Sequence, residues 1–158
     1  MLVDLVTLRP ATAEDADFLR EIFFVVRAPE FVHAGLNGPQ LDALLHQQYG
    51  AMRTHYDRVY PDAEYVIYEL DGKSIGYQAT VVDTSLHLID ISLMPEVRGR
   101  GIGTARMVAL QERARGYGKP LTLTVEIYNP AKRLYERLGF VKYDNKDIYQ
   151  RMRWTPEN

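Results

Sequence analysis

The sequence predicts an α+β protein in which helices pack on a mixed, mostly antiparallel β-sheet. Two observations carry this prediction. Seven short segments are apolar or alternate between apolar and polar residues, and turn residues bound them, as expected of β-strands. Four other segments repeat apolar residues at helical spacing, and the elements follow one another in the order βααβββαβαββ. With 158 residues and no repeat or linker, the chain is expected to form a single domain over residues 1–158.

The first part of the chain is predicted to contain one strand, two helices and the loop that joins the helices. These elements lie at residues 5–9, 12–26, 39–56 and 28–39, respectively. Thr12 and Asp15 have the spacing of a capping box that starts the first helix. Two prolines and two glycines predict the loop, and Pro39 suits the first turn of the second helix.

The rest of the chain is predicted to alternate strands with two further helices. Strands are expected at 64–70, 73–82, 87–93, 121–127, 140–143 and 148–154, and helices at 102–117 and 131–138. Asp71-Gly72 is a favoured two-residue turn between the first two of these strands. Gly139 is expected to end the short helix, and residues 144–147 are expected to form the last turn.

Composition and charge exclude several classes of protein. Hydrophobic residues make up 46% of the chain and charged residues 25%, with a formal net charge of −2, which disfavours a general nucleic-acid binder. The absence of cysteine removes disulfides, thiolate nucleophiles and cysteine metal sites. The apolar runs are far shorter than the roughly 18 residues of a membrane span, and Met1–Asp4 does not resemble a signal peptide. We therefore expect a cytoplasmic protein with neither a nucleic-acid nor a membrane partner.

A glycine-rich stretch, Pro95–Thr104, lies between a predicted strand and a predicted helix. This order directs backbone N–H groups to one point at the positive end of the helix dipole, which suits phosphate or pyrophosphate. The stretch is not a P-loop, and Thr104 stands where the third glycine of a dinucleotide fingerprint belongs. The pattern that fits is Arg-x-x-Gly-x-Gly, formed by Arg98, Gly101 and Gly103.

A second motif follows about thirty residues downstream. Asn129 is followed by Ala131 and then by Leu-Tyr-Glu-x-Leu-Gly-Phe, which ends at Phe140. Together the two motifs resemble the signatures of the GCN5-related N-acetyltransferase (GNAT) family, and the predicted element order is that of its acyl-CoA N-acyltransferase fold. The resemblance implies acetyl-CoA as co-substrate and direct attack of an acceptor amine on the thioester in a ternary complex.

The resemblance also implies roles for individual residues. The family's pyrophosphate loop corresponds here to Arg98, Gly99, Arg100, Gly101, Ile102, Gly103 and Thr104. Backbone groups of Ile91 and Leu93 would hold the pantetheine arm, and Tyr135 would act as general acid toward the departing thiolate. Asn129 would contact the cofactor. However, it precedes Ala131 by two residues where many members have three, and Tyr128 takes the strictly spaced position.

The general base is left open among several candidates. Thr124 stands where some members of the family have a Glu, and Glu126 has the wrong offset. Asp90 is the preferred candidate because a carboxylate within an apolar strand should have a raised pKa. His87, at the start of the same strand, and a water chain are the alternatives, and Asp90 could instead be a solvent-facing or structural residue.

The acceptor amine, a small molecule or a peptide, is not identified by either motif. We expect its pocket to involve residues 26–60 and the last hairpin. The aromatic residues and histidines of the first region could line that pocket or simply pack in the core: Phe31, His33, His46, Tyr49, His55, Tyr56 and Tyr60. Their spacing predicts no metal site. A homodimer is compatible with the resemblance, and the alternative function is a non-catalytic acyl-CoA-binding regulatory domain.

Overall fold

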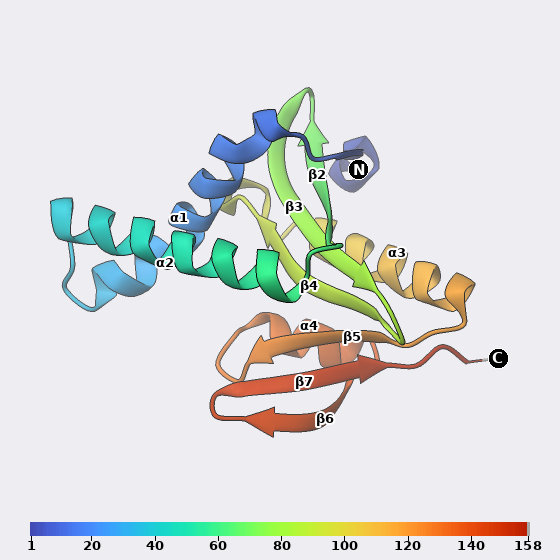
Figure 1. Cartoon of the computed structure of the whole chain (residues 1–158). Coiled ribbons are helices and arrows are strands. Elements are labelled where there is room, and N and C mark those ends of the chain that lie inside the picture. The colour runs from blue at the N-terminus through green and yellow to red at the C-terminus, as the bar shows by residue number, and fades with distance from the viewer. Residues whose placement is uncertain (158) are drawn as a thin grey trace.

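The computed structural model describes residues 1–157 and has the predicted element order βααβββαβαββ (Figure 1). The strands are β1 (Thr7–Pro10), β2 (Glu64–Leu70), β3 (Lys73–Val82), β4 (Leu86–Leu93), β5 (Leu121–Glu126), β6 (Val141–Lys146) and β7 (Tyr149–Trp154). The α-helices are α1 (Ala16–His33), α2 (Gly38–Val59), α3 (Ile102–Tyr117) and α4 (Ala131–Arg137). Three short 3₁₀ turns, at Leu2–Leu5, Ala13–Asp15 and Pro95–Val97, were not predicted.

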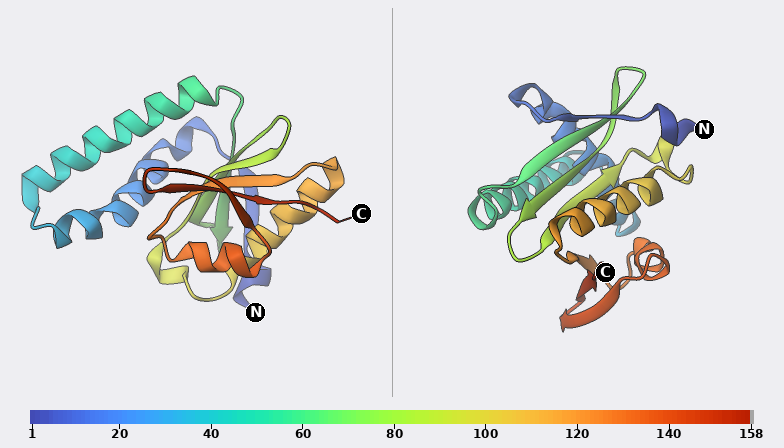
Figure 2. Two further views of the ribbon diagram at one scale, coloured as in Figure 1. Left: turned by 90° about the horizontal axis from the view of Figure 1, so that it is seen from below. Right: turned by 90° about the vertical axis from the view of Figure 1, so that its right-hand side faces the viewer.

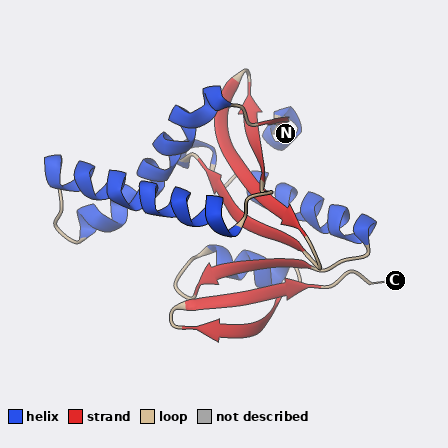
Figure 3. Cartoon of the chain, viewed as in Figure 1, coloured by secondary structure: helices blue, strands red, loops and turns tan. Residues whose placement is uncertain are grey.

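The strands form one seven-stranded sheet in the order β1-β2-β3-β4-β5-β7-β6 (Figure 3). Every neighbouring pair is antiparallel except β4 and β5, which run parallel. This exception follows from the connection, because the chain crosses from β4 to β5 through α3, as parallel pairing requires. The mixed, mostly antiparallel sheet of the prediction is therefore confirmed.

Helices cover both faces of the sheet, two on each (Figures 1 and 2). On one face, Ile22 of α1 packs with Ile67, Tyr77 and Ala79 of β2 and β3. On the other face, α3 and α4 cover apolar residues of β4, β5 and β7, and the fully buried members of that cluster include Leu86, Leu110, Leu121 and Met152. We call these the α1/α2 face and the α3/α4 face.

Helix α1 is longer than predicted, and the loop prediction for residues 28–39 is wrong. The helix continues through Pro29 to His33, so only residues 34–37 separate α1 from α2. Proline removes one backbone hydrogen bond, but its fixed φ is itself helical. The helix is terminated instead by Gly35, at φ 93°, where the Leu36 N–H donates to the Phe31 carbonyl at 2.9 Å in a glycine C-cap arrangement.

Two local predictions at turns had different outcomes. The capping box forms as predicted, with the Thr12 N–H donating to Asp15 Oδ2 at 2.8 Å, and Arg9 donates two further hydrogen bonds to that carboxylate. The last hairpin differs from its prediction, because β6 extends to Lys146 and the turn shortens to residues 147–148. Asp147, at φ 57°, adopts the left-handed conformation that such a tight turn needs.

Candidate active site

A wedge between the parallel strands β4 and β5 is the central feature of the site. The two strands pair at only three positions, ending with Leu88 opposite Leu123, and then diverge (Figure 1). Beyond that point β4 is paired only with β3. The Met94 N–H bonds to the Ile75 carbonyl, so alternation along β4 turns the main-chain groups of Ile91 and Leu93 toward the wedge. These are the two residues whose backbone was predicted to hold a pantetheine arm.

A β-bulge lies where the wedge begins. Consecutive β3 residues Ala79 and Thr80 face Asp90 and Leu88, so Ile89 is an extra residue in β4. Regular alternation would place Asp90 on the same face as Leu88, in the apolar cluster under α3. The extra residue reverses the alternation and directs Asp90 to the α1/α2 face.

The glycine-rich loop lies at the end of β4 that opens into the wedge. Gly101, at φ 86°, is the N-cap residue of α3, and no side chain caps the first N–H groups of that helix. Ile102, Gly103 and Thr104 therefore present backbone donors at a helix N-terminus, as the phosphate-site prediction requires. The Arg98 Nε–H donates to the Leu93 carbonyl at 3.0 Å, which ties the loop to the end of β4.

Tyr135 of α4 lies on the α3/α4 face, in the same apolar cluster as Met107 and Phe140. Its ring is 5.8 Å from that of Phe140, and only 7% of the residue is exposed. Burial, with a smaller contribution from the charge of Asp90, raises the pKa of the Tyr135 phenol to about 12. The phenol therefore stays protonated across the physiological range and can serve as a proton donor.

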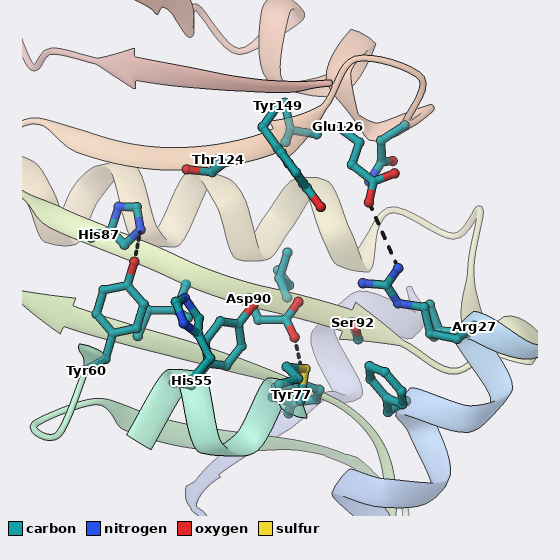
Figure 4. A pocket seen from close by; sticks show the side chains of 18 of the residues that line it. Arg27, His55, Tyr60, Tyr77, His87, Asp90, Ser92, Thr124, Glu126 and Tyr149 are labelled. Atoms are coloured by element: carbon teal, nitrogen blue, oxygen red, sulfur yellow. Dashed lines mark hydrogen bonds and ion pairs between the residues drawn. The ribbon is translucent and has the colours of Figure 1, made fainter. Parts of the chain in front are cut away.

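A cavity of about 610 Å³ lies on the α1/α2 face, on the other side of the wedge (Figure 4). Residues from both helices and from β3, β4, β5 and β7 line it, including Arg27, Glu30, His55, Tyr56, Tyr60, Tyr77, His87, Asp90, Ser92, Thr124, Glu126, Asn129 and Tyr149. Three carboxylates face a single guanidinium in this cavity, and aromatic rings form much of its wall. We call it the first cavity.

Asp90 projects into the first cavity and accepts a hydrogen bond from the Tyr77 hydroxyl (Figure 4). Burial raises the pKa of the Asp90 carboxyl, whereas the bonds from Tyr77 and from the Ile91 N–H, together with the charge of Arg27, lower it. Burial is the largest of these effects, so the net direction is upward. A carboxylate in this state can take a proton from a group in the cavity more readily than an ordinary surface aspartate.

His87 joins the first cavity to a chain of hydroxyl groups. Its Nε2 lies 3.5 Å from the Tyr60 hydroxyl, and its Nδ1 lies 2.9 Å from Thr122 Oγ1, which is 2.9 Å from Ser85 Oγ. Burial lowers the pKa of His87, which favours the neutral imidazole. His87 therefore remains an alternative base, in the place where the sequence analysis put it.

Some, but not all, of the residues that the sequence singled out line the first cavity. Asn129 lines the first cavity, but its Oδ1 accepts from the Ala131 N–H at 2.9 Å and so caps the turn before α4. Of the aromatic residues and histidines left open, His55, Tyr56 and Tyr60 line the cavity, whereas His46 and Tyr49 pack between α1 and α2. Tyr77 and Arg27 also line the cavity, although no sequence motif marks them.

Among residues 1–157, no three histidine, aspartate or glutamate side chains gather as a metal-binding group would. None of the helices in the same range combines the length and the apolar character that crossing a membrane requires.

The α+β fold thus combines a glycine-rich helix N-terminus, a wedge between parallel strands and a carboxylate-lined cavity around β4. A sequence profile of the acetyltransferase (GNAT) family matches residues 28–140, more than half of the chain. The chain belongs to this family. An uncharacterised N-acetyltransferase of Methanocaldococcus jannaschii is 34% identical over 86 residues, and the aligned stretch spans 52% of this chain and 54% of that relative, about half of each.

Solved structures resemble the whole chain in fold. The PaiA N-acetyltransferase of Thermoplasma acidophilum, solved in complex with coenzyme A, superimposes with a TM-score of 0.71 at 17% identity, covering 96% of this chain and 99% of that one. A GCN5-related N-acetyltransferase of Rhodopseudomonas palustris also has a TM-score of 0.71, at 19% identity and 99% coverage of both chains. At these identities the likeness establishes the fold, in agreement with the prediction.

Proposed function

We propose that this protein transfers the acetyl group of acetyl-CoA to a primary amine by direct attack in a ternary complex, and that residues 1–158 form a single N-acetyltransferase domain. The observation that carries the proposal is the wedge, which connects the glycine-rich loop on one face with the carboxylate-lined cavity on the other. Membership of the family and the coenzyme A complex of a structural neighbour support the choice of cofactor.

Bound acetyl-CoA would supply an activated acyl group as a thioester. The backbone N–H groups of Ile102, Gly103 and Thr104 would bind its phosphates, with positive charge from Arg98 and Arg100. The Ile91 carbonyl and the Leu93 N–H, which face the wedge, would pair with the pantetheine arm, as a missing strand would. The thioester would thus come to the wedge between the two faces, and Asn129 would contact the cofactor from the cavity side.

Asp90 and Tyr135 would take part in the proton transfers of the reaction. An amine reaches the cavity mostly protonated near neutral pH, and Asp90 would accept one of its protons and release it to solvent. The freed lone pair would form the C–N bond as the C–S bond breaks, and the nitrogen would lose a second proton to water as the amide forms. The Tyr135 hydroxyl would protonate the departing thiolate and regain its proton from solvent. The chain has no cysteine for an acetyl-enzyme intermediate, which favours direct transfer.

The test is acetyl-CoA-dependent release of free thiol in the presence of a panel of primary amines. We expect thiol to form only when both substrates are present, and acetyl-CoA alone should raise the melting temperature. Absence of any stabilisation at saturating acetyl-CoA would contradict the proposal. Stabilisation without transfer to any amine would instead favour the alternative, a non-catalytic acyl-CoA-binding domain.

A further inference from the structure

A second cavity, of about 920 Å³, lies beside the first on the α1/α2 face, and nothing in the proposed reaction uses it. The two cavities share Tyr60, His87 and Thr124 in their walls, so they are adjacent, and the contact between Tyr60 and His87 lies where they meet. The second cavity reaches the start of β4 and β5, where Ser85 and Pro120 lie. An acceptor longer than a simple amine could therefore extend from one cavity into the other.

The charge of the floor changes sign between the two cavities. Three successive rungs of the β5–β7 ladder face this side of the sheet: Glu126 opposite Tyr149, Thr124 opposite Arg151, and Thr122 opposite Arg153. The first rung lines the first cavity, where Asp90 adds another carboxylate. The two arginines line the second cavity, whose wall also includes Asp62 and Asp83. A ligand lying along these rungs would meet carboxylates at one end and guanidinium groups at the other.

Both arginines are free to bind an anion. Arg151 has one ion pair, to Asp144 at 3.9 Å, and both partners are more than half exposed, so solvent weakens that pair. Arg153 has its guanidinium 4.2 Å above the Tyr143 ring, an arrangement that leaves the N–H groups at its edge available. The hydroxyls of Thr122 and Ser85 add polar groups to the same cavity. Guanidinium groups of this kind bind carboxylates and phosphates with two parallel hydrogen bonds.

The phosphates of coenzyme A are not the anion that this cavity would bind. The glycine-rich loop follows the opposite end of β4, and the eight residues of that strand span roughly 25 Å. The cofactor-side residues Ile91 and Leu93 also face the α3/α4 side, whereas Arg151 and Arg153 face the α1/α2 side. The anion must therefore belong to the acceptor.

We infer that the acceptor is a primary amine that carries a carboxylate or phosphate group, and that Arg151 and Arg153 bind this anion while the amine lies beside Asp90. This inference rests on the proposed function. Each rung is roughly 7 Å from the next along a strand, so the anion should lie roughly 7–13 Å from the amine. An ω-amino acid, a short peptide or an aminoalkyl phosphate has this form.

Matched acceptors test the inference on the full chain. We would measure kcat and KM for ω-amino acids of increasing length, for their neutral primary amides and for ω-aminoalkyl phosphates. The anionic members should be preferred over the amides by roughly tenfold or more, at the lengths that span the two cavities. A preference for only one of the two anions identifies carboxylate or phosphate as the natural group, and a preference for both supports the anion subsite itself.

Charge substitutions provide the matched variants. Arg151→Gln with Arg153→Gln should raise KM for the anionic acceptors by roughly tenfold or more, with kcat and the amide reactions unchanged. Lys142→Gln removes a positive charge on β6 outside both cavities, so it should change neither KM for the anionic acceptors nor kcat. Asp83→Asn removes a carboxylate from the wall of the second cavity and should lower KM for the anionic acceptors.

Two results would overturn the inference. One is equal use of anionic and neutral acceptors by the unaltered protein. The other is retention of a full anion preference by the double arginine variant. The increase in melting temperature that each acceptor causes in the coenzyme A-bound protein is a second readout that needs no turnover. Equal stabilisation by an anionic acceptor and its neutral amide, or stabilisation by neither, would also overturn the inference. Transfer of acetyl groups to neutral amines alone would leave the proposed function standing and refute only the anion subsite.

Discussion

The two faces of the sheet would hold the two proposed substrates by different means. On the α3/α4 face, the candidate cofactor contacts are backbone groups of the glycine-rich loop and of β4. On the α1/α2 face, the candidate acceptor contacts are side chains from two helices and four strands. Backbone recognition needs few side chains but strict conformations, whereas side-chain recognition needs charges and rings placed by the whole fold. Substitutions should therefore act differently on the two faces.

The largest expected effect is on the acceptor face, at Asp90. We expect Asp90→Asn to lower kcat by about 10³-fold, because the buried carboxylate with the raised pKa would no longer accept the amine proton, with KM for acetyl-CoA unchanged. Steady-state kinetics at several pH values checks this. In the unaltered enzyme kcat/KM should rise with pH through the raised pKa of Asp90. In the variant, the only remaining rise of kcat/KM with pH should be the one caused by deprotonation of the acceptor amine. An unchanged pH profile would assign the base to His87 or to water.

A smaller loss is expected on the cofactor face, at Tyr135. Tyr135→Phe removes the hydroxyl but keeps the ring beside Phe140, so the protein should remain folded. We expect kcat to fall by about 10²-fold while affinity for acetyl-CoA is retained, because water can replace the phenol as proton donor only in part. Rapid measurement of thiol release together with a cofactor titration checks both parameters. Full activity in this variant would exclude the phenol as general acid.

Backbone conformation is tested at Gly101, the N-cap of α3. Its φ of 86° is strained for any residue with a Cβ, so Gly101→Ala should cost about 1 kcal/mol of stability. The displaced loop amides should raise KM for acetyl-CoA by about tenfold and leave KM for the acceptor unchanged. Gly116→Ala is the matched control, because Gly116 lies within α3 with open space where a Cβ would project, and alanine favours a helix. Similar kinetics for the two variants would mean that the loop does not bind the cofactor through its backbone.

The smallest expected effect is at Arg27, which compensates negative charge in the first cavity. Its guanidinium lies 3.8 Å from Glu30 and 4.0 Å from Glu126 and lowers the pKa of Asp90. Arg27→Gln should therefore move the rising limb of kcat/KM to higher pH and lower KM for a cationic acceptor by about threefold. Arg20→Gln, which removes a surface charge paired with Asp17, is the control. A change in KM for acetyl-CoA in the Arg27 variant would contradict the assignment of the two substrates to different faces.

The same contrast explains what could be predicted from the sequence. The helix that follows the glycine-rich loop and the short helix that carries Tyr135 were predicted correctly, because spacing within one element largely determines its local geometry. The extension of α1 through Pro29 was missed because proline usually ends a helix, whereas here Pro29 continues it and Gly35 terminates it. Tyr77 was missed because only the register of β3 with β4 brings its hydroxyl to Asp90.

The orientation of Asp90 illustrates the limit most clearly. Simple alternation counted from Leu88 gives the wrong face for this residue, and nothing in the local sequence marks Ile89 as an extra residue. Asp90 was predicted as a base because it is a carboxylate within an apolar strand, and that pattern does not indicate to which face of the sheet the side chain points. Gly76 is a further requirement of the same pairing, because a Cβ there would lie 2.5 Å from the Ser92 carbonyl oxygen.

The bulge at Ile89 also has a consequence for the kinetics of cofactor binding. The bulge lies beside the last paired position of β4 and β5. Because bulges increase the local twist, the extra residue in β4 turns this strand away from β5. No hydrogen-bonded ladder has to open before a cofactor can enter. Association of acetyl-CoA should then be a single second-order step whose observed rate increases linearly with concentration, without the plateau that a slow opening step would impose.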